Sequence, residues 1–250
     1  MGANEIAKQQ SVKSGLTCHM IDDARHSTNE MPYKALIGNA YPEFYKIIIT
    51  PEAYSRAAFR LAKKIIESDF RPDIILPVWR GGAEPTMKIT GALERCGLEF
   101  DHFPIQSYRY RSDNLGETKP IGIRSIPEAI DIINGKSVGI TGQTRTHERI
   151  LLSDDVFDEG ITIQKIREQL RTGIKHSPDI RVATVYWKSY ANKTLLKPDF
   201  YDTVFDRAII DGIERKPWIV FPHEINDLDD RELELAYPEV YKIFNPQTQR

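Results

Sequence analysis

The sequence predicts one α/β domain, a mostly parallel sheet of about five strands flanked by helices. Two segments carry this prediction, because each has the pattern of a buried strand, a short polar turn and the start of a helix. They are residues 150–162, ILLSDDVFDEGIT, and residues 72–82, PDIILPVWRGG. A third observation is the continuous apolar run in residues 72–78, which is typical of a strand covered on both faces. Such sheets bind ligands at the carboxyl ends of their strands.

The composition is that of an ordinary globular protein and excludes several classes. Of the 250 residues, 40% are hydrophobic and 28% are charged, and the formal net charge is −2. We expect neither nucleic-acid nor membrane binding, because there is no basic excess and no apolar run near the roughly 20 residues of a membrane span. Cys18 and Cys96 are too few for a disulfide framework or a zinc cluster. With no signal-peptide pattern, we expect a cytoplasmic protein.

The N-terminal part predicts an extension followed by the first elements of the domain. Residues 1–40 are polar and without periodicity, so we expect an irregular extension there. A short strand is predicted at Tyr45–Ile49. The sequence TPE at residues 50–52 is a typical helix start, with an N-cap, a proline at the first helical position and an acid in the first turn. Apolar residues then repeat on one face up to Glu67, where we expect the helix to end.

The second strand ends in a turn with one arginine and two glycines. After the strand at residues 72–78, Arg80 and Gly81 lie in the turn, and a helix is predicted at Glu84–Arg95, with Gly97 to stop it. A cation beside a permissive backbone suits a diphosphate group. The alternative is a plain turn in which glycine allows tight packing and the arginine is solvated.

The middle of the chain predicts short elements around a polar loop. A strand is expected at Phe103–Ser107, and residues 108–124 are polar with few apolar anchors, which predicts a mobile loop. A helix capped by the preceding serine is expected at Ile126–Ile133, and a strand at Ser137–Thr141. Residues 116–148 together have the character of an insertion.

After the acidic segment, the pattern predicts a helix to about Arg171 and then a β-branched strand at Asp179–Trp187. This strand is followed by Lys188, which is either a site residue or an ordinary solvated strand end. Two further short strands are expected at residues 203–205 and 217–222.

The C-terminal tail, residues 225–250, is acidic and then helical. Its helical pattern covers residues 232–244 and is interrupted by Pro238. We expect the tail to pack on the domain, residues 41–224, or on a partner subunit.

The acidic segment carries the strongest chemical signal. Asp154, Asp155 and Asp158 lie within five positions of one another, just before Gly160 and Thr162 at a predicted helix start. Backbone N–H groups at a helix start favour a phosphate, and carboxylates beside a phosphate require a cation or sugar hydroxyls between them. The alternative is a solvated turn with an N-cap.

Taken in this order, the segments resemble the type I phosphoribosyltransferases, and most of all the 6-oxopurine branch with the xanthine–guanine and hypoxanthine–guanine enzymes. The resemblance extends over Tyr45–Glu224 and lies in the RGG turn, residues 150–162, the strand-end Lys188 and the segment WIVFPHE. It implies a three-layer phosphoribosyltransferase fold with a small C-terminal hood. One position departs from the family, because Glu159 stands where relatives usually have threonine.

The resemblance implies a site for 5-phosphoribosyl diphosphate (PRPP). Arg80 and Gly81 would form the diphosphate loop, whose peptide in this family is often cis, and Ser107 and Tyr108 would begin a lid. Asp154 and Asp155 would hold the ribose hydroxyls, directly or through Mg²⁺. The 5′-phosphate would be wrapped by Asp158, Glu159, Gly160, Ile161 and Thr162.

The resemblance also implies a purine site and a metal site. Asp158 would be the catalytic acid/base near N7 of the base, and Lys188 would donate to its 6-oxo group. Trp218 would stack on the base, and the backbone of Ile219 would meet its exocyclic edge. Glu224 occupies a position where relatives carry an aspartate near a second metal. The Mg²⁺ ligands, direct or through water, would be Asp154, Asp155 and Glu224.

The implied activity is the Mg²⁺-dependent transfer of the 5-phosphoribosyl group from PRPP to guanine, hypoxanthine or xanthine, as in purine salvage. The products would be the nucleoside 5′-monophosphate and diphosphate. A homodimer or homotetramer is expected from the resemblance and from the prevalence of symmetric oligomers. The alternatives are a regulatory protein of this fold that senses PRPP or nucleotides, a phosphoribosyltransferase with a non-standard acceptor, and a receiver-like or phosphatase-like Mg²⁺ site.

Overall fold

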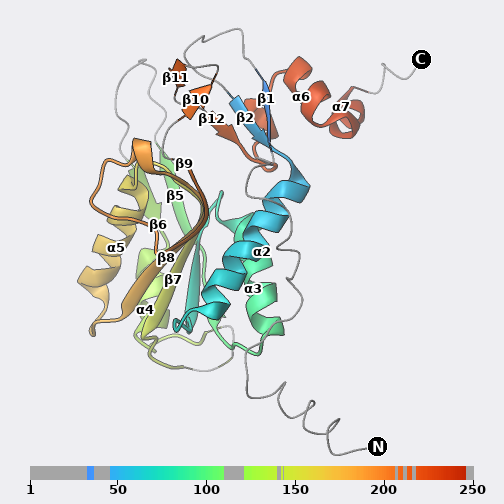
Figure 1. The fold of residues 1–250 in the computed structure, drawn as a ribbon. Helices are drawn as coiled ribbons and strands as arrows, with labels where there is room; N and C mark the ends of the chain where they lie inside the picture. Colours follow the sequence, from blue (N-terminus) through green and yellow to red (C-terminus); the bar gives the residue numbers. More distant parts are fainter. Residues whose placement is uncertain are drawn as a thin grey trace, which may run out of the picture.

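A central, mostly parallel sheet organises the molecule (Figure 1). The structure, a computed structural model, describes residues 33–36, 46–109, 121–139, 142, 144–205, 208–210, 213–215 and 218–245. The sheet has the strand order β6-β5-β3-β7-β8-β9, with β4 beside β3. Its strands are β3 (Ile74–Trp79), β4 (Asp101–His102), β5 (Ile105–Arg109), β6 (Ile121–Arg124), β7 (Arg149–Phe157), β8 (Asp179–Lys188) and β9 (Phe200–Phe205). Five neighbouring strands, β5, β3, β7, β8 and β9, are parallel, as the sequence predicted.

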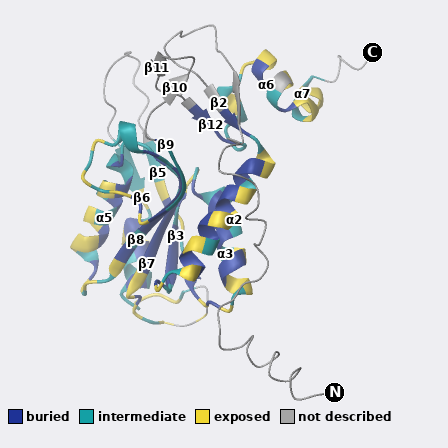
Figure 2. Cartoon of the chain, viewed as in Figure 1, coloured by how far each residue is buried: buried dark blue, intermediate teal, exposed yellow. Residues whose placement is uncertain are grey.

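Two pairs of helices cover the two faces of the sheet and make three layers (Figure 1). One face is covered by α2 (Pro51–Glu67) and α3 (Ala83–Arg95), and the other by α4 (Ile126–Ile133) and α5 (Ile161–Gly173). Successive side chains of β7 point to opposite faces, so that Leu151 packs toward α2 and α3 while Ile150 and Leu152 pack toward α4 and α5. Figure 2 shows the helices turning buried residues toward the sheet and exposed residues outward.

The predicted start of α2 is confirmed in detail. The hydroxyl of Thr50 accepts a hydrogen bond of 3.3 Å from the backbone N–H of Ala53, and Pro51 is the first helical residue. The residues that α2 buries recur at helical spacing: Ala53, Tyr54, Ala57, Ala58, Leu61, Ala62, Ile65 and Ile66.

The hood is assembled from both ends of the chain. Its sheet has the order β1-β2-β12, formed by β1 (Tyr33–Leu36), β2 (Lys46–Ile49) and β12 (Trp218–Val220). In a separate two-stranded sheet, β10 (Ala208–Ile210) pairs antiparallel with β11 (Ile213–Arg215). β12 is parallel to β2. The C-terminal strands predicted for the hood are therefore present, and they are completed by N-terminal ones. The rest of the predicted extension, residues 1–32 and 37–40, lies outside the described residues.

The C-terminal tail packs on the hood. It contains the 3₁₀ turn Ile225–Asp227, α6 (Asp230–Ala236) and α7 (Pro238–Phe244), so the helical pattern breaks where Pro238 predicted. The hydroxyl of Tyr237 donates a 2.7 Å hydrogen bond to the carbonyl of Ile49. The tail therefore contacts the domain, as one of the two predictions stated. None of the helices in the described residues is long and apolar enough to cross a membrane.

The middle of the chain differs from its predictions. Where the mobile loop was predicted, Ile121–Arg124 forms β6 and pairs antiparallel with β5, while residues 110–120 lie outside the described residues. The alternation of β6 covers only four residues, too few to stand out from a polar stretch. Gly122 is needed there, because a Cβ at this position would overlap the ring of Tyr108.

Two local predictions beside α4 are wrong. The bounds of α4 agree with the sequence, but Ser125 has a φ of 68° and its side chain makes no capping hydrogen bond. No strand forms at residues 137–139, the described part of the strand predicted at 137–141. Instead, Asn134 and Thr146 form an isolated antiparallel bridge that closes this segment.

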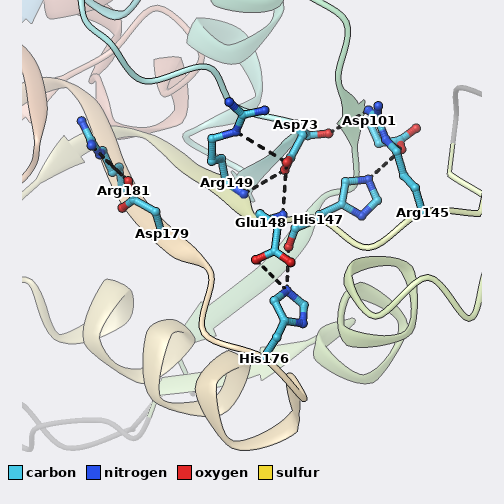
Figure 3. A network of polar contacts seen from close by, with 9 residues as sticks. All are labelled: Asp73, Asp101, Arg145, His147, Glu148, Arg149, His176, Asp179 and Arg181. Carbon is cyan, nitrogen blue, oxygen red and sulfur yellow. Dashed lines mark hydrogen bonds and ion pairs between the residues drawn. The ribbon is translucent and has the colours of Figure 1, made fainter.

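A polar network lies at the amino ends of the central strands (Figure 3). Asp101 and His147 are each 1% exposed, and Nε2 of His147 lies 2.8 Å from Oδ2 of Asp101. Nearby, the carboxylate of Asp73 accepts hydrogen bonds from the backbone N–H groups of Glu148 and Arg149 at 3.1 and 3.0 Å. The network connects the start of β7 to β3 and β4. It lies at the end of the sheet opposite the turns that follow β3 and β7.

Candidate active site

The glycine-rich turn and the acidic segment lie side by side. β3 and β7 are parallel neighbours paired from Ile74↔Ile150 to Pro77↔Ser153, so the turns after both strands open at the same edge of the sheet. A cavity of about 700 Å³ lies between them. Its described lining comprises Val78–Gly81, Ser107, Tyr108, Ile121, residues 154–163, His223 and Glu224.

The two glycines of the turn are required by close packing. A Cβ at Gly81 would overlap the carboxylate of Asp155, and one at Gly82 would lie 2.8 Å from the carbonyl oxygen of Val78. The peptide bond between Trp79 and Arg80 is cis, and Arg80 is exposed at the rim. The turn therefore brings a cation and bare backbone against the acidic segment.

The acidic segment ends in an open helix N-terminus. Gly160 has a φ of 78° and precedes α5 without a capping side chain, so the first N–H groups of α5 lack the usual side-chain acceptor. These groups, from Ile161 and Thr162 onward, border the cavity. A phosphate would satisfy them and would interact favourably with the helix dipole.

Asp154 and Asp155 form the most acidic part of the cavity. Asp155 is 7% exposed, and its carboxylate accepts a 2.6 Å hydrogen bond from the N–H of Val156. Burial, followed by the charge of Asp155, raises the pKa of Asp154 well above its usual value. A bound cation would offset the cost of burying these two neighbouring negative charges, so the donor set fits Mg²⁺.

His223 and Glu224 complete this acidic region from the hood side. One ligand atom each from Asp155, His223 and Glu224 lies within 4.8 Å of the others. Burial and then the charge of Asp155 raise the pKa of Glu224. Burial acts to lower the pKa of His223, but its hydrogen bond to Asp155 and the surrounding carboxylate charges outweigh this and raise it.

Sequence reasoning assigned no role to His223 or to Glu84. Nδ1 of His223 lies 3.3 Å from Oε2 of Glu84, and Nε2 lies 3.2 Å from Oδ2 of Asp155. The available signal was the position of His223, directly before Glu224 after a predicted strand of the motif WIVFPHE. Glu84 had no comparable signal, because an acid in the first turn of a helix is usual.

The ammonium group of Lys188 lies 3.0 Å from the carboxylate of Asp158, which lines the cavity. Lys188 is 6% exposed, so it is not a solvated strand end. Glu159 is also paired: its carboxylate forms an ion pair with Lys193, and its carbonyl accepts a 2.9 Å hydrogen bond from the Lys193 N–H. The negative charge that departs from the family pattern is thus compensated.

The residues predicted to bind the base differ in whether they line the cavity. Ile219 lies in β12 and is buried in the core, so only its backbone is available to a ligand. Trp218 lies in the same strand, but its side chain is outside the described residues. Neither Ile219 nor Lys188 is among the described residues that line the cavity. Ser107 and Tyr108 do line it, from β5.

No protein-family model matches the sequence, and no curated protein is similar enough to match it. Several solved structures are similar to it. A hypothetical protein from Neisseria gonorrhoeae with bound ppGpp has a TM-score of 0.56 and 21% identity, over 78% of this chain and 97% of that one. A purine phosphoribosyltransferase from Pyrococcus horikoshii Ot3 has a TM-score of 0.47 and 24% identity, over 72% and 93%. A Helicobacter pylori xanthine-guanine-hypoxanthine phosphoribosyltransferase has a TM-score of 0.48 and 16% identity, over 72% and 95%.

Proposed function

We propose that this protein transfers the 5-phosphoribosyl group of PRPP to a 6-oxopurine base, a function that its three-layer fold and its site support. One observation carries this proposal. The RGG turn, the acidic segment and Glu224, which are far apart in the sequence, meet around a single cavity of about 700 Å³. A cavity of this size suits a small phosphorylated substrate.

The cavity offers a matching group for each part of PRPP. The open N-terminus of α5, with the hydroxyl of Thr162, would bind the 5′-phosphate. Asp154 and Asp155 would accept hydrogen bonds from the ribose hydroxyls. Arg80, with the backbone of Gly81, would bind the diphosphate by charge-assisted hydrogen bonds.

Asp154, Asp155 and Glu224 would hold Mg²⁺, directly or through water. When bound, Mg²⁺ would neutralise charge on the diphosphate leaving group. Arg80, which lines the same cavity, would stabilise the same developing charge. Ser107 and Tyr108 would begin a cover that keeps water from the reacting carbon.

The chemistry requires an acid/base on the side of the purine. The bond between C1 of the sugar and the diphosphate oxygen breaks as the bond to the purine nitrogen forms, with oxocarbenium character at C1. The incoming base loses a proton, which the Asp158 carboxylate would accept near N7. Lys188, held by Asp158, would donate a hydrogen bond to the 6-oxo group. Trp218 would stack on the base and the Ile219 backbone would meet its exocyclic edge.

The test is an assay of the purified protein with PRPP and Mg²⁺ against guanine, hypoxanthine, xanthine, adenine, uracil and orotate, with nucleotide and diphosphate both measured. We expect product from at least one 6-oxopurine and none after chelation. Product from adenine, uracil or orotate alone would overturn the purine assignment. Thermal stabilisation by PRPP without product from any base would instead favour a non-standard acceptor or a sensor.

A nucleotide-binding regulatory function is the second candidate. The neighbour with the highest of the three TM-scores, 0.56, is the Neisseria gonorrhoeae protein with bound ppGpp. The groups proposed for the phosphates of PRPP would also suit a nucleotide with two diphosphates. Competition between ppGpp and PRPP, measured by calorimetry, tests this candidate. Tight ppGpp binding without turnover of any base would favour it over the enzyme.

A further inference from the structure

We propose that His223 is a nitrogen ligand of a divalent cation that it binds together with Asp155 and Glu224, and that this position prefers a transition-metal ion such as Mn²⁺ to Mg²⁺. For its role the inference rests on the proposed function, because the cation concerned is the one that would accompany PRPP. It adds a residue that the carboxylate-only site implied by the sequence does not contain.

The first support is the spacing of the donor atoms. One ligand atom from each of Asp155, His223 and Glu224 lies within 4.8 Å of the others. Nε2 of His223 and Oδ2 of Asp155 are 3.2 Å apart. Two ligands on adjacent positions of one ion, each about 2.1 Å from it, are separated by roughly 3 Å. A cation can therefore enter between these atoms with little movement of the side chains.

The second support is the partner of the other imidazole nitrogen. Nδ1 of His223 lies 3.3 Å from Oε2 of Glu84, whose other oxygen lies 3.0 Å from the ammonium group of Lys88. Histidines that bind metals usually donate their second N–H to a carboxylate, which sets the tautomer and the ring orientation. The ring of Phe221 stacks on the imidazole at 5.6 Å with an interplanar angle of 6°, which fixes the plane further. Nε2 is thus the nitrogen left to face the cation.

The third support is the hydroxyl group of Tyr54. Tyr54 is fully buried, and its hydroxyl has no hydrogen-bond partner among the described residues. Its ring centroid is 6.0 Å from that of His223. A water bound to the cation would give this orphaned hydroxyl its missing partner.

The donor set determines the kind of ion. Imidazole nitrogen suits Mn²⁺, Fe²⁺, Co²⁺ or Zn²⁺ better than Mg²⁺, which prefers oxygen ligands and keeps several waters. Binding at Nε2 requires the ring proton to sit on Nδ1, which faces Glu84. In the alternative, His223 is only a positive counter-ion for Asp155, and any cation is held by carboxylates alone.

The experiment uses the full chain with Mn²⁺ and no substrate. Electron paramagnetic resonance measures free Mn²⁺ during a titration, and electron spin-echo modulation detects a ¹⁴N nucleus bound to the metal. We expect one bound Mn²⁺ with ¹⁴N coupling, and about tenfold excess Mg²⁺ should displace less than half of it. Bound Mn²⁺ without ¹⁴N coupling, no binding, or ready displacement by Mg²⁺ would overturn the proposal.

Variants separate a ligand from a structural residue. His223→Gln should abolish the ¹⁴N coupling, and coupling that survives would overturn the proposal. Glu84→Gln should weaken Mn²⁺ binding about tenfold or more but keep the coupling, because it alters only the support of the imidazole. His102→Gln is the matched control, since His102 is exposed on β4 near the opposite end of the sheet and should change neither readout.

The outcomes also separate this inference from the proposed function. Turnover of a 6-oxopurine with Mn²⁺ bound but no ¹⁴N coupling would overturn the ligand role of His223 and leave the enzyme. Coupling that disappears in His223→Gln, in a protein that neither binds PRPP nor forms product, would overturn the proposed function and leave a nitrogen-ligated cation site without the role assigned to it.

Discussion

The ammonium group of Lys188 lies 3.0 Å from the carboxylate of Asp158, although the two residues are 30 positions apart in the sequence. The contact follows from the sheet, because β7 and β8 are parallel and pair Phe157 with Trp187, so the next residues leave the same edge together. A buried cation and a carboxylate at this edge would present a hydrogen-bond donor and a proton acceptor to one base. The first two predictions separate these roles.

Asp158→Asn should lower kcat by about 10²- to 10⁴-fold, because the amide cannot accept the proton of the base. PRPP binding should be nearly unchanged, since the backbone of residues 159–162 would still bind the phosphate. Steady-state kinetics and calorimetry with PRPP measure the two effects. Asp179→Asn, at the opposite end of β8, is the matched control. Unchanged turnover in Asp158→Asn would remove Asp158 from the mechanism.

Lys188→Met should raise the KM for the purine while leaving PRPP affinity close to its original value. A hydrogen bond to a charged group contributes about 1.5–3 kcal/mol, which corresponds to about 10- to 150-fold in affinity. Methionine has a similar length and tolerates the buried position. Thermal unfolding checks that the variant is folded. An equal loss of affinity for PRPP and for the base would show that Lys188 supports the whole site and does not contact the purine.

Glu159→Thr should tighten PRPP binding several-fold, about 3-fold or more, because it removes a carboxylate from the phosphate cradle and releases Lys193 toward the phosphate. Lys193→Met should weaken PRPP binding, since it removes the cation that offsets the Glu159 charge there. In the double variant, Lys193→Met should weaken PRPP binding less than it does when it is made alone. Calorimetry on all four proteins gives the coupling. Unchanged or weaker PRPP binding by Glu159→Thr would mean that the 5′-phosphate does not lie beside residue 159.

Local patterns were sufficient for the central units of the fold and for part of the site. The segments at residues 72–95 and 150–171 have strong strand and helix periodicity, and their structures lie close to the predicted bounds. Their turns meet because parallel neighbours end at one edge. The contacts of His223 could not be predicted from local patterns, because its partners Glu84 and Asp155 are 139 and 68 residues away in the sequence. The pairing of β2 with β12 in the hood could not be predicted either, because β12 lies near the other end of the chain.

Gly81→Ala should lower PRPP affinity sharply, by about tenfold or more, because the new Cβ would overlap the Asp155 carboxylate and force the RGG turn and the acidic segment apart. Gly91→Ala is the control, since a Cβ there meets nothing within 4 Å and Gly91 lies inside α3. This control should gain about 0.5–1 kcal/mol of stability, as alanine favours helices over glycine. Normal PRPP binding by Gly81→Ala would show that the close approach of the two turns is not needed.

His147→Ala should destabilise the protein without altering the site. Asp101 and His147 are each 1% exposed, and His147 also makes a 3.2 Å hydrogen bond to the carbonyl of Ile132. Removing the imidazole breaks a buried hydrogen bond to Asp101, which keeps its contact with Arg145, and it leaves a void, so we expect a loss of about 1–3 kcal/mol. Urea unfolding measures the loss, and kcat per folded molecule should stay the same. Asp179→Ala breaks a partly exposed ion pair with Arg181 and should cost less than about 1 kcal/mol. Equal losses in the two variants would mean that burial gives the Asp101–His147 pair no special weight, and that α4 is held to the sheet by its apolar face alone.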